Sequence, residues 1–361
     1  MKIIYLFTHD LIKHSGVTKK VISQTNIWKK LGHQVKICNI SLQKSQISLS
    51  PFKDNEVYYR NNIFNGPKRL IQDINKYNPD IIYFRFEPYK PYLGKILKNY
   101  KVIVELNTND YKEMKLHSKK NFDRKIRFHY YNMTKSLIYK NIVGFVAVTD
   151  EIANLPHILK WKKPSISIPN SIDINNYKTQ KISKSNNISN ILFMGNLDHE
   201  WNGIDKIIDL AKKTVGKLYF HIIGLNNKYR TDFENIKFYG YLQKKEYLEI
   251  VKKCDIGLGT VALHRKQMFE ACPLKVREYL AYGLPIIIGY SDATFVNSKL
   301  PEWVLELPNE NNNISNNVGL ILEFCKKMKN RIIHHDEIKN YIDSNILEIN
   351  KLVFFKKIID G

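Results

Sequence analysis

The chain has 361 residues, a length that predicts two or three domains. Apolar residues make up 43% of it and charged residues 25%, which excludes a mainly disordered protein. Lysine and arginine number 57 against 34 aspartates and glutamates, and the resulting net charge of +23 exceeds what solubility requires. The surplus therefore favours an anionic partner: nucleic acid, a phospholipid surface or a phosphate-bearing substrate.

The sequence carries no pattern for export, a membrane span or a metal site. The four cysteines (Cys38, Cys254, Cys272 and Cys325) are widely separated and include no Cys-x-x-Cys pair, which is typical of a reducing cytoplasm. The first apolar run is too short for a secretory core, and no run approaches the roughly 20 residues of a membrane-spanning helix. We therefore expect a cytoplasmic protein that needs no metal.

Short apolar runs alternate with longer amphipathic stretches over the first 168 residues. The run 3–7 predicts a buried strand, 14–17 a turn, 19–31 a helix that ends at Gly32, and 34–40 a second strand. Further buried strands are predicted at 80–84, 102–106 and 144–149. Because strands that alternate with helices form parallel sheets, we expect a parallel sheet with helices on both faces.

The same alternation starts again after a turn-rich segment at 168–173 and a polar stretch at 178–190 that suits a linker. Glycine follows several of the new apolar runs. Strands are predicted at 191–194, 218–223, 236–239, 256–259 and 286–289. We therefore expect two similar α/β domains divided near residue 170, followed by a terminal helix that packs back on the first domain.

The segment 269–286 carries the most specific pattern in the chain. Pro273 suits the start of a helix and Gly283 the residue after its end, so a helix of about ten residues is predicted there. Free N–H groups at the start of such a helix attract phosphate. Lys275 lies in the first turn and Glu278 about one turn later. Their spacing fits either an exposed i,i+3 salt bridge, or a pair that binds an anion and the hydroxyls of a sugar.

The whole segment resembles the donor-nucleotide helix of retaining GT-B glycosyltransferases of the family 4 type. Those enzymes carry two glutamates separated by seven residues, then a Gly-x-Pro turn into a strand, and Glu270, Glu278 and Gly283-Leu284-Pro285 match this order. Pro-Leu-Lys-x-x-Glu-Tyr, the core of many members, is present from Pro273 to Tyr279. The resemblance implies that Glu278 binds the ribose hydroxyls and that Glu270 lies near the donor sugar.

The resemblance extends over nearly the whole chain and implies the GT-B fold, in which two Rossmann-like domains with parallel sheets face each other across a cleft. Residues 1–170 would form the acceptor-side domain, 171–340 the nucleotide-sugar donor domain, and 341–361 the helix that returns to the N-terminal domain. Gly16 resembles the glycine loop that approaches the donor phosphates, although an ordinary strand-to-helix turn explains it equally well. Tyr241 follows the strand that flanks the base.

The sequence departs from the family where a cationic clamp usually holds the donor diphosphate. Members have an arginine and a lysine after the first donor-domain strand, and Asn196 and Asn202 stand at those positions here. Arg265, Lys266 and Lys275 are local substitutes, since bidentate arginine suits phosphate. For Arg265 and Lys266 a solvated basic loop is the alternative interpretation.

Polar residues also stand at the ends of strands in the N-terminal half. Asn107 occupies the place where the family often has a histidine near the reacting sugar, with Glu105 beside it as a second catalytic candidate. Arg85 and Glu87 end another strand. Ligands of parallel α/β sheets bind at the carboxyl ends of strands, so this pair would contact the acceptor or donor, or else form salt bridges near a loop.

The resemblance implies transfer of a hexosyl or related sugar, with retention, from a nucleotide diphosphate sugar to a hydroxyl of a glycan or lipid-linked acceptor. Such chemistry needs no cofactor, because the nucleotide sugar is a co-substrate, and it fits the biosynthesis of surface polysaccharide or glycoconjugates. A non-catalytic GT-B partner subunit is the alternative that Asn196 and Asn202 leave open. A basic nucleic-acid-binding protein is less favoured, since no helix-turn-helix, zinc-finger or RNA-recognition signature is present.

The basic surplus is concentrated partly between residues 112 and 140. Lysines and arginines there interleave with Phe122, Phe128, Tyr130, Tyr131 and Tyr139. Such a mixture suits a helix on an anionic membrane surface, and a solvated helix whose aromatic side chains face the core is the other interpretation. The first interpretation would place this cytoplasmic protein on the inner face of the plasma membrane.

Overall fold

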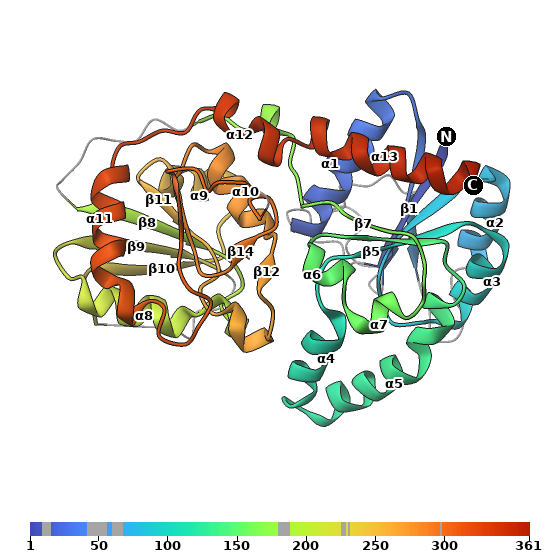
Figure 1. Ribbon diagram of the computed structural model, residues 1–361, viewed down its shortest axis with the longest axis horizontal. Helices are drawn as coiled ribbons and strands as arrows, with labels where there is room; N and C mark the ends of the chain where they lie inside the picture. The colour runs from blue at the N-terminus through green and yellow to red at the C-terminus, as the bar shows by residue number, and fades with distance from the viewer. Residues whose placement is uncertain are drawn as a thin grey trace. The chain divides into compact units, whose positions relative to one another are not determined.

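The computed structural model describes residues 1–8, 16–41, 56–59, 68–179, 188–224, 229, 232–296 and 298–361. The chain divides into two compact units. Unit 1 comprises Met1–Pro169 with Ser344–Gly361, and unit 2 comprises Asn170–Asp343. Each unit is an α/β domain built on a parallel sheet (Figure 1).

Unit 1 contains a seven-stranded sheet with the order β3-β2-β1-β4-β5-β6-β7, in which every pairing is parallel. The chain begins in the middle of the sheet and winds outward in both directions, so the order reverses between β1 and β4. The strands are β1 (Lys2–Thr8), β2 (Gln34–Ser41), β3 (Val57–Tyr59), β4 (Ile81–Arg85), β5 (Val102–Leu106), β6 (Gly144–Ala147) and β7 (Ser165–Ser167). Residues 3–7 of β1 are wholly buried, as expected for a strand covered by helices on both faces.

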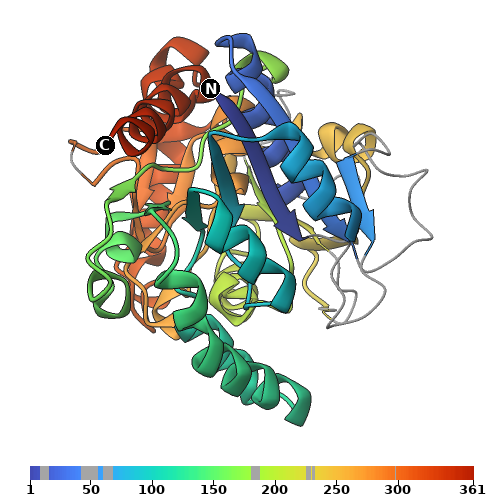
Figure 2. The same cartoon turned by 90° about the vertical axis from the view of Figure 1, so that its right-hand side faces the viewer.

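Helices cover both faces of this sheet (Figure 2). They are α1 (Gly16–Lys30), α2 (Lys68–Tyr77), α3 (Pro91–Asn99), α4 (Asp110–Ser118), α5 (Phe122–Tyr139), α6 (Asp150–Ala153), α7 (Pro156–Leu159) and α13 (Ser344–Asp360). The last of them packs beside α1, where the rings of Trp28 and Phe355 lie 5.6 Å apart. The buried carboxylate of Glu348 accepts hydrogen bonds of 2.9 Å from both Gln24 and Trp28. The terminal helix is therefore part of the core of unit 1.

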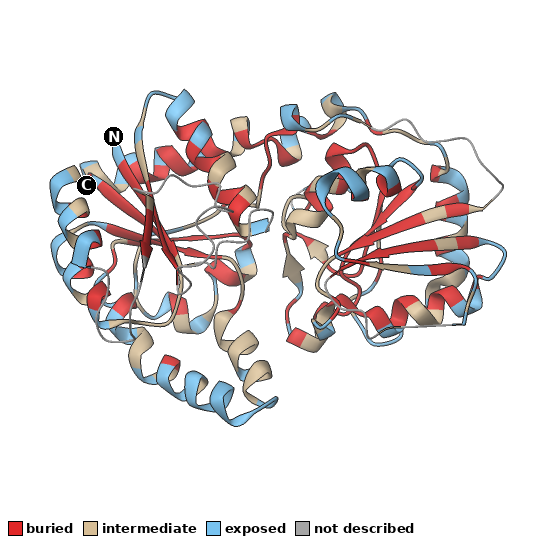
Figure 3. Cartoon of the chain, turned by 180° about the vertical axis from the view of Figure 1, so that it is seen from behind, coloured by how far each residue is buried: buried red, intermediate tan, exposed pale blue. Residues whose placement is uncertain are grey.

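Unit 2 contains a six-stranded parallel sheet with the order β10-β9-β8-β11-β13-β15, and a separate parallel pair, β12-β14. The strands are β8 (Ser189–Met194), β9 (Leu218–Ile223), β10 (Ile236–Gly240), β11 (Ile256–Leu258), β12 (Glu270–Ala271), β13 (Ile286–Ile288), β14 (Ser291–Asp292) and β15 (Val304–Glu306). The helices are α8 (Ile204–Lys213), α9 (Lys244–Val251), α10 (Leu274–Ala281), α11 (Val318–Met328) and α12 (His335–Ile342). The central strands of both sheets are buried along most of their length (Figure 3).

The predicted strands all form, with bounds within two residues of the expectation. The expected turn at 14–17 is wrong at Gly16 and Val17, which are the first residues of α1, while His14 and Ser15 lie outside the described residues. The polar stretch at 178–190 is in part the start of β8, and its residues 180–187 also lie outside the described ranges. Pro273 immediately precedes α10 as its N-cap residue instead of opening its first turn.

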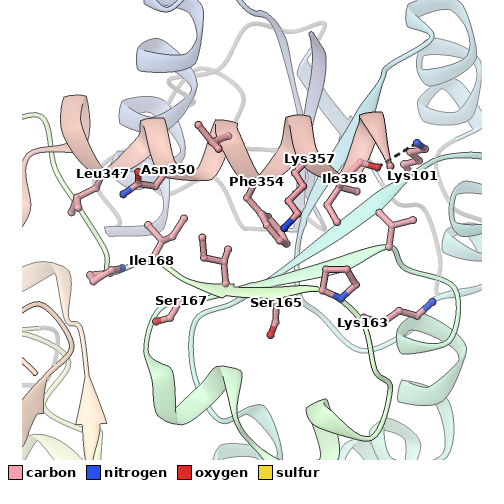
Figure 4. A pocket seen from close by; sticks show the side chains of 16 residues that line it. Lys101, Lys163, Ser165, Ser167, Ile168, Leu347, Asn350, Phe354, Lys357 and Ile358 are labelled. Atoms are coloured by element: carbon pink, nitrogen blue, oxygen red, sulfur yellow. Dashed lines mark hydrogen bonds between the residues drawn. The ribbon is translucent and has the colours of Figure 1, made fainter. Parts of the chain in front are cut away.

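A cavity of about 1,030 Å³ lies within unit 1, between β7 and α13. Apolar side chains of both elements line it, with Lys101, Lys163 and Lys357 among them (Figure 4). The Lys101 ammonium donates to the carbonyl oxygen of Ile359 (2.8 Å) near the end of α13. None of the predicted site residues lines this cavity.

Candidate functional site

Three neighbouring strands of unit 2 end at glycine: β8 at Gly195, β9 at Gly224 and β10 at Gly240. The Gly195 N–H donates to the Ile223 carbonyl and the Gly224 N–H to the Gly240 carbonyl, each at 2.9 Å. A Cβ atom on Gly224 would lie only 2.1 Å from the Gly195 oxygen, so a side chain is sterically excluded there. The carboxyl edge of the sheet therefore presents bare backbone, which a ligand can approach closely.

Helix α10, which carries the signature sequence, is fixed against these strands by Tyr279. The Tyr279 hydroxyl accepts a hydrogen bond from the Met194 N–H at the end of β8 (2.7 Å). A Cβ atom on Gly257 would lie 2.4 Å from the Tyr279 ring, so the glycine in β11 makes room for the tyrosine. Gly283 ends the helix with φ +89°, a left-handed conformation that glycine adopts without strain. The position of α10 is therefore determined by packing rather than by its own side-chain pairs.

Lys275 points from the first turn of α10 toward the end of β8. Its ammonium donates to Asn202 Oδ1 (3.0 Å) and lies 3.9 Å from the centre of the Phe193 ring. Across the described ranges no carboxylate pairs with it, and the expected i,i+3 salt bridge to Glu278 is not formed. Burial lowers the pKa of Lys275 to about 7. The structure thus leaves a half-buried lysine with only neutral partners at the end of β8.

Glu278 lies on α10 one turn after Lys275 but has a different neighbour. One of its carboxylate oxygens accepts a hydrogen bond from the Tyr177 hydroxyl (3.4 Å), and the Tyr177 ring meets Tyr282 edge to face at 5.1 Å. Both Glu278 and Glu270 are half-buried. Glu270 lies in β12, which pairs with β14. Sequence reasoning did not find Tyr177, because 101 residues separate it from Glu278.

The two asparagines at the positions of the usual clamp form one connected cluster with Lys275. Asn202 is 5% exposed and donates from its amide to the Asn196 carbonyl (2.7 Å). Its side-chain oxygen accepts from Thr260 (3.2 Å) and Lys275 (3.0 Å). The Asn196 side chain accepts from the N–H of Asp198 (3.0 Å) and so shapes the turn after β8. The side chains of Asn196 and Asn202 therefore fix the loop after β8, which places Asn202 beside Lys275.

The neighbouring cation Arg265 is balanced by a carboxylate, unlike Lys275. Its guanidinium makes two hydrogen bonds to Asp205 (2.8 and 2.6 Å) and one to the Glu200 carbonyl (3.0 Å). These bonds from Arg265 lower the pKa of Asp205. The Lys266 ammonium lies 4.6 Å from the centre of the Trp201 ring, and Tyr241 is 53% exposed after β10. The structure therefore brings Lys275, Asn196 and Asn202 together and gives Arg265 a separate partner.

Arg277, in the middle of the signature, has a structural environment. Its side chain is fully buried and makes a two-point ion pair with Asp292. It also donates to the Asn170 carbonyl (3.1 Å) and the Cys272 sulfur (2.8 Å). Arg277 thus fixes the backbone before α10 and around β14, and it contributes to the site only by positioning its neighbours.

In unit 1, Glu105 is the centre of a buried network at the ends of β1, β4 and β5. Its carboxylate accepts from the Tyr5 hydroxyl (2.6 Å) and lies 2.6 Å from the Lys20 ammonium and 3.5 Å from the Arg85 guanidinium. Burial alone would raise the pKa of Glu105, but Lys20 and Arg85 outweigh it and lower that pKa well below its usual range. Burial also lowers the pKa of Lys20 to about 8. The one carboxylate of this cluster thus pairs with both of its cations.

The remaining candidates of unit 1 lie around this network. Asn107 accepts a 2.6 Å hydrogen bond from Lys20, which α1 carries one turn after Gly16. Glu87 belongs to a separate cluster: it accepts from Thr8 (2.5 Å) and Tyr92 (3.2 Å) and pairs with Lys90. Arg85 and Glu87 thus both take part in salt bridges, as the second interpretation of this pair expected.

Sequence reasoning did not find two further residues of unit 1. Asn109 caps α4, because its side chain accepts from the N–H of Lys112 (3.1 Å). Sequence reasoning also missed Lys20. The one signal for it was a lysine on the buried face of an amphipathic helix, opposite an acid inside an apolar strand.

Neither a metal cluster nor a membrane span is found within the described part of the chain. Its His, Cys, Asp and Glu side chains include no group of three or more that is placed to hold a metal ion. None of its helices is both long and apolar enough to cross a bilayer. All four cysteines are buried as free thiols.

Comparisons with known proteins agree with this architecture. Residues 188–306 match the family model described as glycosyl transferases group 1, and no curated protein sequence matches the chain. Sucrose-phosphate synthase from Thermosynechococcus elongatus has a TM-score of 0.71 at 11% identity, over 100% of both chains. A glycosyltransferase from Rickettsia africae scores 0.65 at 16% identity, over 100% of this chain and 99% of that one. Anabaena HepE in complex with UDP and glucose scores 0.65 at 12% identity, over 98% and 99%.

The chain has the GT-B fold of glycosyltransferases, with two parallel-sheet α/β domains. Structural identities this low carry the fold alone, whereas the sequence match is specific to unit 2. That match places segment 188–306, which includes Glu270, Lys275 and Glu278, with the group 1 glycosyl transferases. The expected fold class and the resemblance to group 1 glycosyl transferases are thereby confirmed.

Proposed function

We propose that the protein is a retaining glycosyltransferase that moves a sugar from a nucleotide diphosphate sugar to a hydroxyl group of an acceptor. The observation that carries the proposal is Lys275, a half-buried lysine with only neutral partners at glycine-terminated strands. A buried ammonium without a counter-ion is unfavourable, and a bound diphosphate would supply that counter-ion. The Anabaena protein with this fold, in complex with UDP and glucose, supports the same ligand class.

The proposal gives the residues of unit 2 separate roles. Lys275 replaces the missing clamp cation, since its ammonium lies 3.0 Å from Asn202, where the family has lysine. The first turn of α10 adds N–H groups, because Pro273 at the N-cap provides no side-chain oxygen to occupy them. Glu278 binds the ribose hydroxyls, with Tyr177 orienting its carboxylate. Glu270 contacts the hydroxyls of the donor sugar.

In the proposed reaction the acceptor oxygen attacks the anomeric carbon from the face that the phosphate leaves. The bond between that carbon and the phosphate oxygen breaks as the new glycosidic bond forms. The departing phosphate takes the acceptor proton, and the nucleoside diphosphate is the second product. Lys275 and the first turn of α10 stabilise the charge that grows on the phosphate, so the protein acts mainly through positioning and electrostatics. No cofactor takes part in this scheme.

Unit 1 contributes positioning residues in this scheme. The ion pairs of Glu105 hold Lys20, and Lys20 in turn holds Asn107, the candidate that stands where the family often has histidine. We assign the acceptor a glycan or lipid-linked structure and place the protein in the cytoplasm, at the inner face of the membrane. The net charge of +23 supports that assignment, because a few cations suffice for the donor.

Calorimetric titration of the purified protein with uridine, guanosine and adenosine diphosphates tests the proposal. One of the three should bind saturably, and Glu278→Ala should abolish that binding without lowering the melting temperature. Glu249→Ala, an exposed glutamate of α9, is the matched control and should bind normally. Absence of binding by all three nucleotides would overturn the proposal. Binding without turnover of the nucleotide sugar and a lipid-linked acceptor would instead identify a non-catalytic subunit.

A further inference from the structure

Helix α5 carries an apolar stripe on its solvent side. Phe122, Ile126, Tyr130, Met133 and Leu137 are 74, 53, 41, 79 and 46% exposed. At 100° per residue these five positions fall within an arc of about 80°, so they form one continuous line along the helix. The opposite side of α5 is attached to unit 1 through Tyr131, Ile138 and Tyr139, which are all buried. The stripe is therefore an outward face of an anchored helix.

The aromatic residues of this region divide between the two interpretations, because some face the core and others are exposed. Tyr131 and Tyr139 face the core, where both rings meet Phe86 at 6.0 and 5.4 Å. Phe122 faces solvent instead, and Tyr130 is 41% exposed although its hydroxyl donates to the Tyr89 carbonyl (2.8 Å). Figures 1 and 2 show α4 and α5 extending beyond the rest of unit 1, which makes the stripe accessible to a flat surface.

Basic residues border the stripe. Lys125 and Arg127 lie on its two sides, and Lys119, Lys120, Arg124 and Lys140 are also exposed in the same region. Asp123 is the one acidic residue between positions 119 and 140. A hollow of about 490 Å³ at the corner between α4 and α5 is lined by Lys119, Lys125, Phe122 and two polar residues. Apolar and cationic groups therefore alternate around one exposed face.

We propose that this face of α5, the stripe with its basic border, docks unit 1 on an anionic phospholipid bilayer. The apolar side chains enter the boundary between headgroups and acyl chains, and the lysines and arginines contact the lipid phosphates. This inference rests on the proposed function, since a lipid-linked acceptor would be presented at that surface. It adds to that function the residues that contact the membrane.

The charge distribution selects this occupant over a second copy of the chain. Two such faces would bring six exposed cations of each copy against those of the other, with one acid on each side to offset them. An anionic bilayer instead complements the basic border on both sides of the stripe. The stripe is also one helix face wide, which matches a helix lying in the plane of an interface.

Sedimentation of the full-length protein with vesicles tests this docking. We expect binding to phosphatidylcholine vesicles that contain phosphatidylglycerol, weaker binding to phosphatidylcholine alone, and a decrease as ionic strength rises. The double variant Phe122→Ser with Met133→Ser should lower the partition coefficient roughly tenfold or more, because both side chains lose apolar contact. Val215→Ser with Leu320→Ser is the matched control, since these unit 2 residues are 50 and 46% exposed.

The basic border has its own pair of variants. Lys125→Gln with Arg127→Gln should lower the partition coefficient by roughly fivefold per charge, whereas Lys212→Gln with Lys326→Gln, which removes the same charge from unit 2, should change it little. Tryptophan fluorescence of Met133→Trp should shift to shorter wavelength on vesicle addition. Equal binding of the stripe variant and wild type, equal binding to both kinds of vesicle, or no vesicle binding would each overturn the proposal.

Nucleotide titration in the absence of vesicles separates this inference from the proposed function. The α5 variants should bind the nucleoside diphosphate with wild-type affinity, because their residues lie in unit 1, outside the donor domain. Nucleotide binding without vesicle binding would overturn only the docking surface. Vesicle binding without nucleotide binding would overturn only the glycosyltransferase assignment.

Discussion

The two units share a strand order but differ in the partners of the cationic side chains at their strand ends. In each sheet the first strand lies centrally, with the second and third strands on one side and the later ones on the other. At the strand ends of unit 1, Lys20 and Arg85 share the carboxylate of Glu105. At those of unit 2, Lys275 meets the neutral Asn202 and the Phe193 ring. The cations of unit 1 thus have an acidic partner within the fold, whereas the lysine of unit 2 has only neutral partners, and an anionic ligand would balance its charge.

The largest effect that tests this comparison is expected in unit 1. Glu105→Ala would leave Lys20 and Arg85 buried without their carboxylate, and should lower the free energy of unfolding by about 3–5 kcal/mol. Urea denaturation measures the change. Glu249→Ala removes only an exposed pair with Lys252 and should cost less than about 1 kcal/mol. A small effect at Glu105 would mean that its network does not hold unit 1 together.

Lys275→Met should separate binding from stability. Loss of charge-assisted hydrogen bonds to the diphosphate should weaken nucleotide binding by about 2–3 kcal/mol in calorimetry. The unliganded variant should be as stable as wild type or more so, because burial lowers the pKa of Lys275 from 10.5 to about 7 and the charged form is thus disfavoured in the folded state. That gain should be greatest below pH 7 and disappear as pH rises toward 10.5.

Lys206→Met is the control for Lys275→Met, since its ammonium donates to the Val261 and Glu310 carbonyls and to Asn313. It should destabilise unit 2, because three acceptors lose their donor. A Lys275→Met protein that is destabilised but still binds nucleotide would make Lys275 a structural residue and remove the contrast between the units.

The pH dependence of nucleotide binding should report the same cation. Above pH 7 Lys275 loses its proton in the free protein, so binding must take up a proton and affinity should fall by up to about tenfold per pH unit. Lys275→Arg keeps its charge at every accessible pH and should flatten the profile. Titration of the nucleotide itself affects wild type and Lys275→Arg equally. It therefore cancels when the pH profile of one protein's affinity is subtracted from that of the other. Identical profiles would exclude Lys275 as the titrating group.

The smallest effects are expected from two matched tyrosines. Tyr177→Phe removes the hydroxyl that contacts Glu278 but keeps the ring against Tyr282, so nucleotide affinity should fall only a fewfold, about 0.5–1 kcal/mol. Tyr5→Phe removes a donor to the buried Glu105 and should instead lower stability by about 1–3 kcal/mol with nucleotide affinity unchanged. Thermal melts and nucleotide titrations of both variants test this. Loss of stability in Tyr177→Phe, or loss of nucleotide affinity in Tyr5→Phe, would contradict it.

Local patterns allowed much of the fold to be predicted. The strands that were found are apolar runs of four to seven residues, long enough to show burial on both faces. Five strands, β3, β7, β12, β14 and β15, were missed, and each has only two or three residues. In β7, serine stands at two of those positions, so little apolar signal remains.

The candidate site was predictable where its residues are close in sequence. Glu270, Lys275 and Glu278 fall within nine residues, and their spacing identified the family. The contacts of these residues were not predictable, since Lys275 reaches Asn202 across 73 positions and Lys20 reaches Asn107 across 87. Such pairs depend on the order of strands in a sheet, which a single sequence does not specify.

The return of α13 to unit 1 gives the nascent chain a folding order. Glu348 and Phe355, which complete the core around Trp28, are synthesised after every residue of unit 2. On the ribosome, unit 2 can therefore reach its final packing first, while Trp28 and Gln24 still lack their contacts with α13. Unit 1 begins the chain and yet is completed last, because its core includes α13.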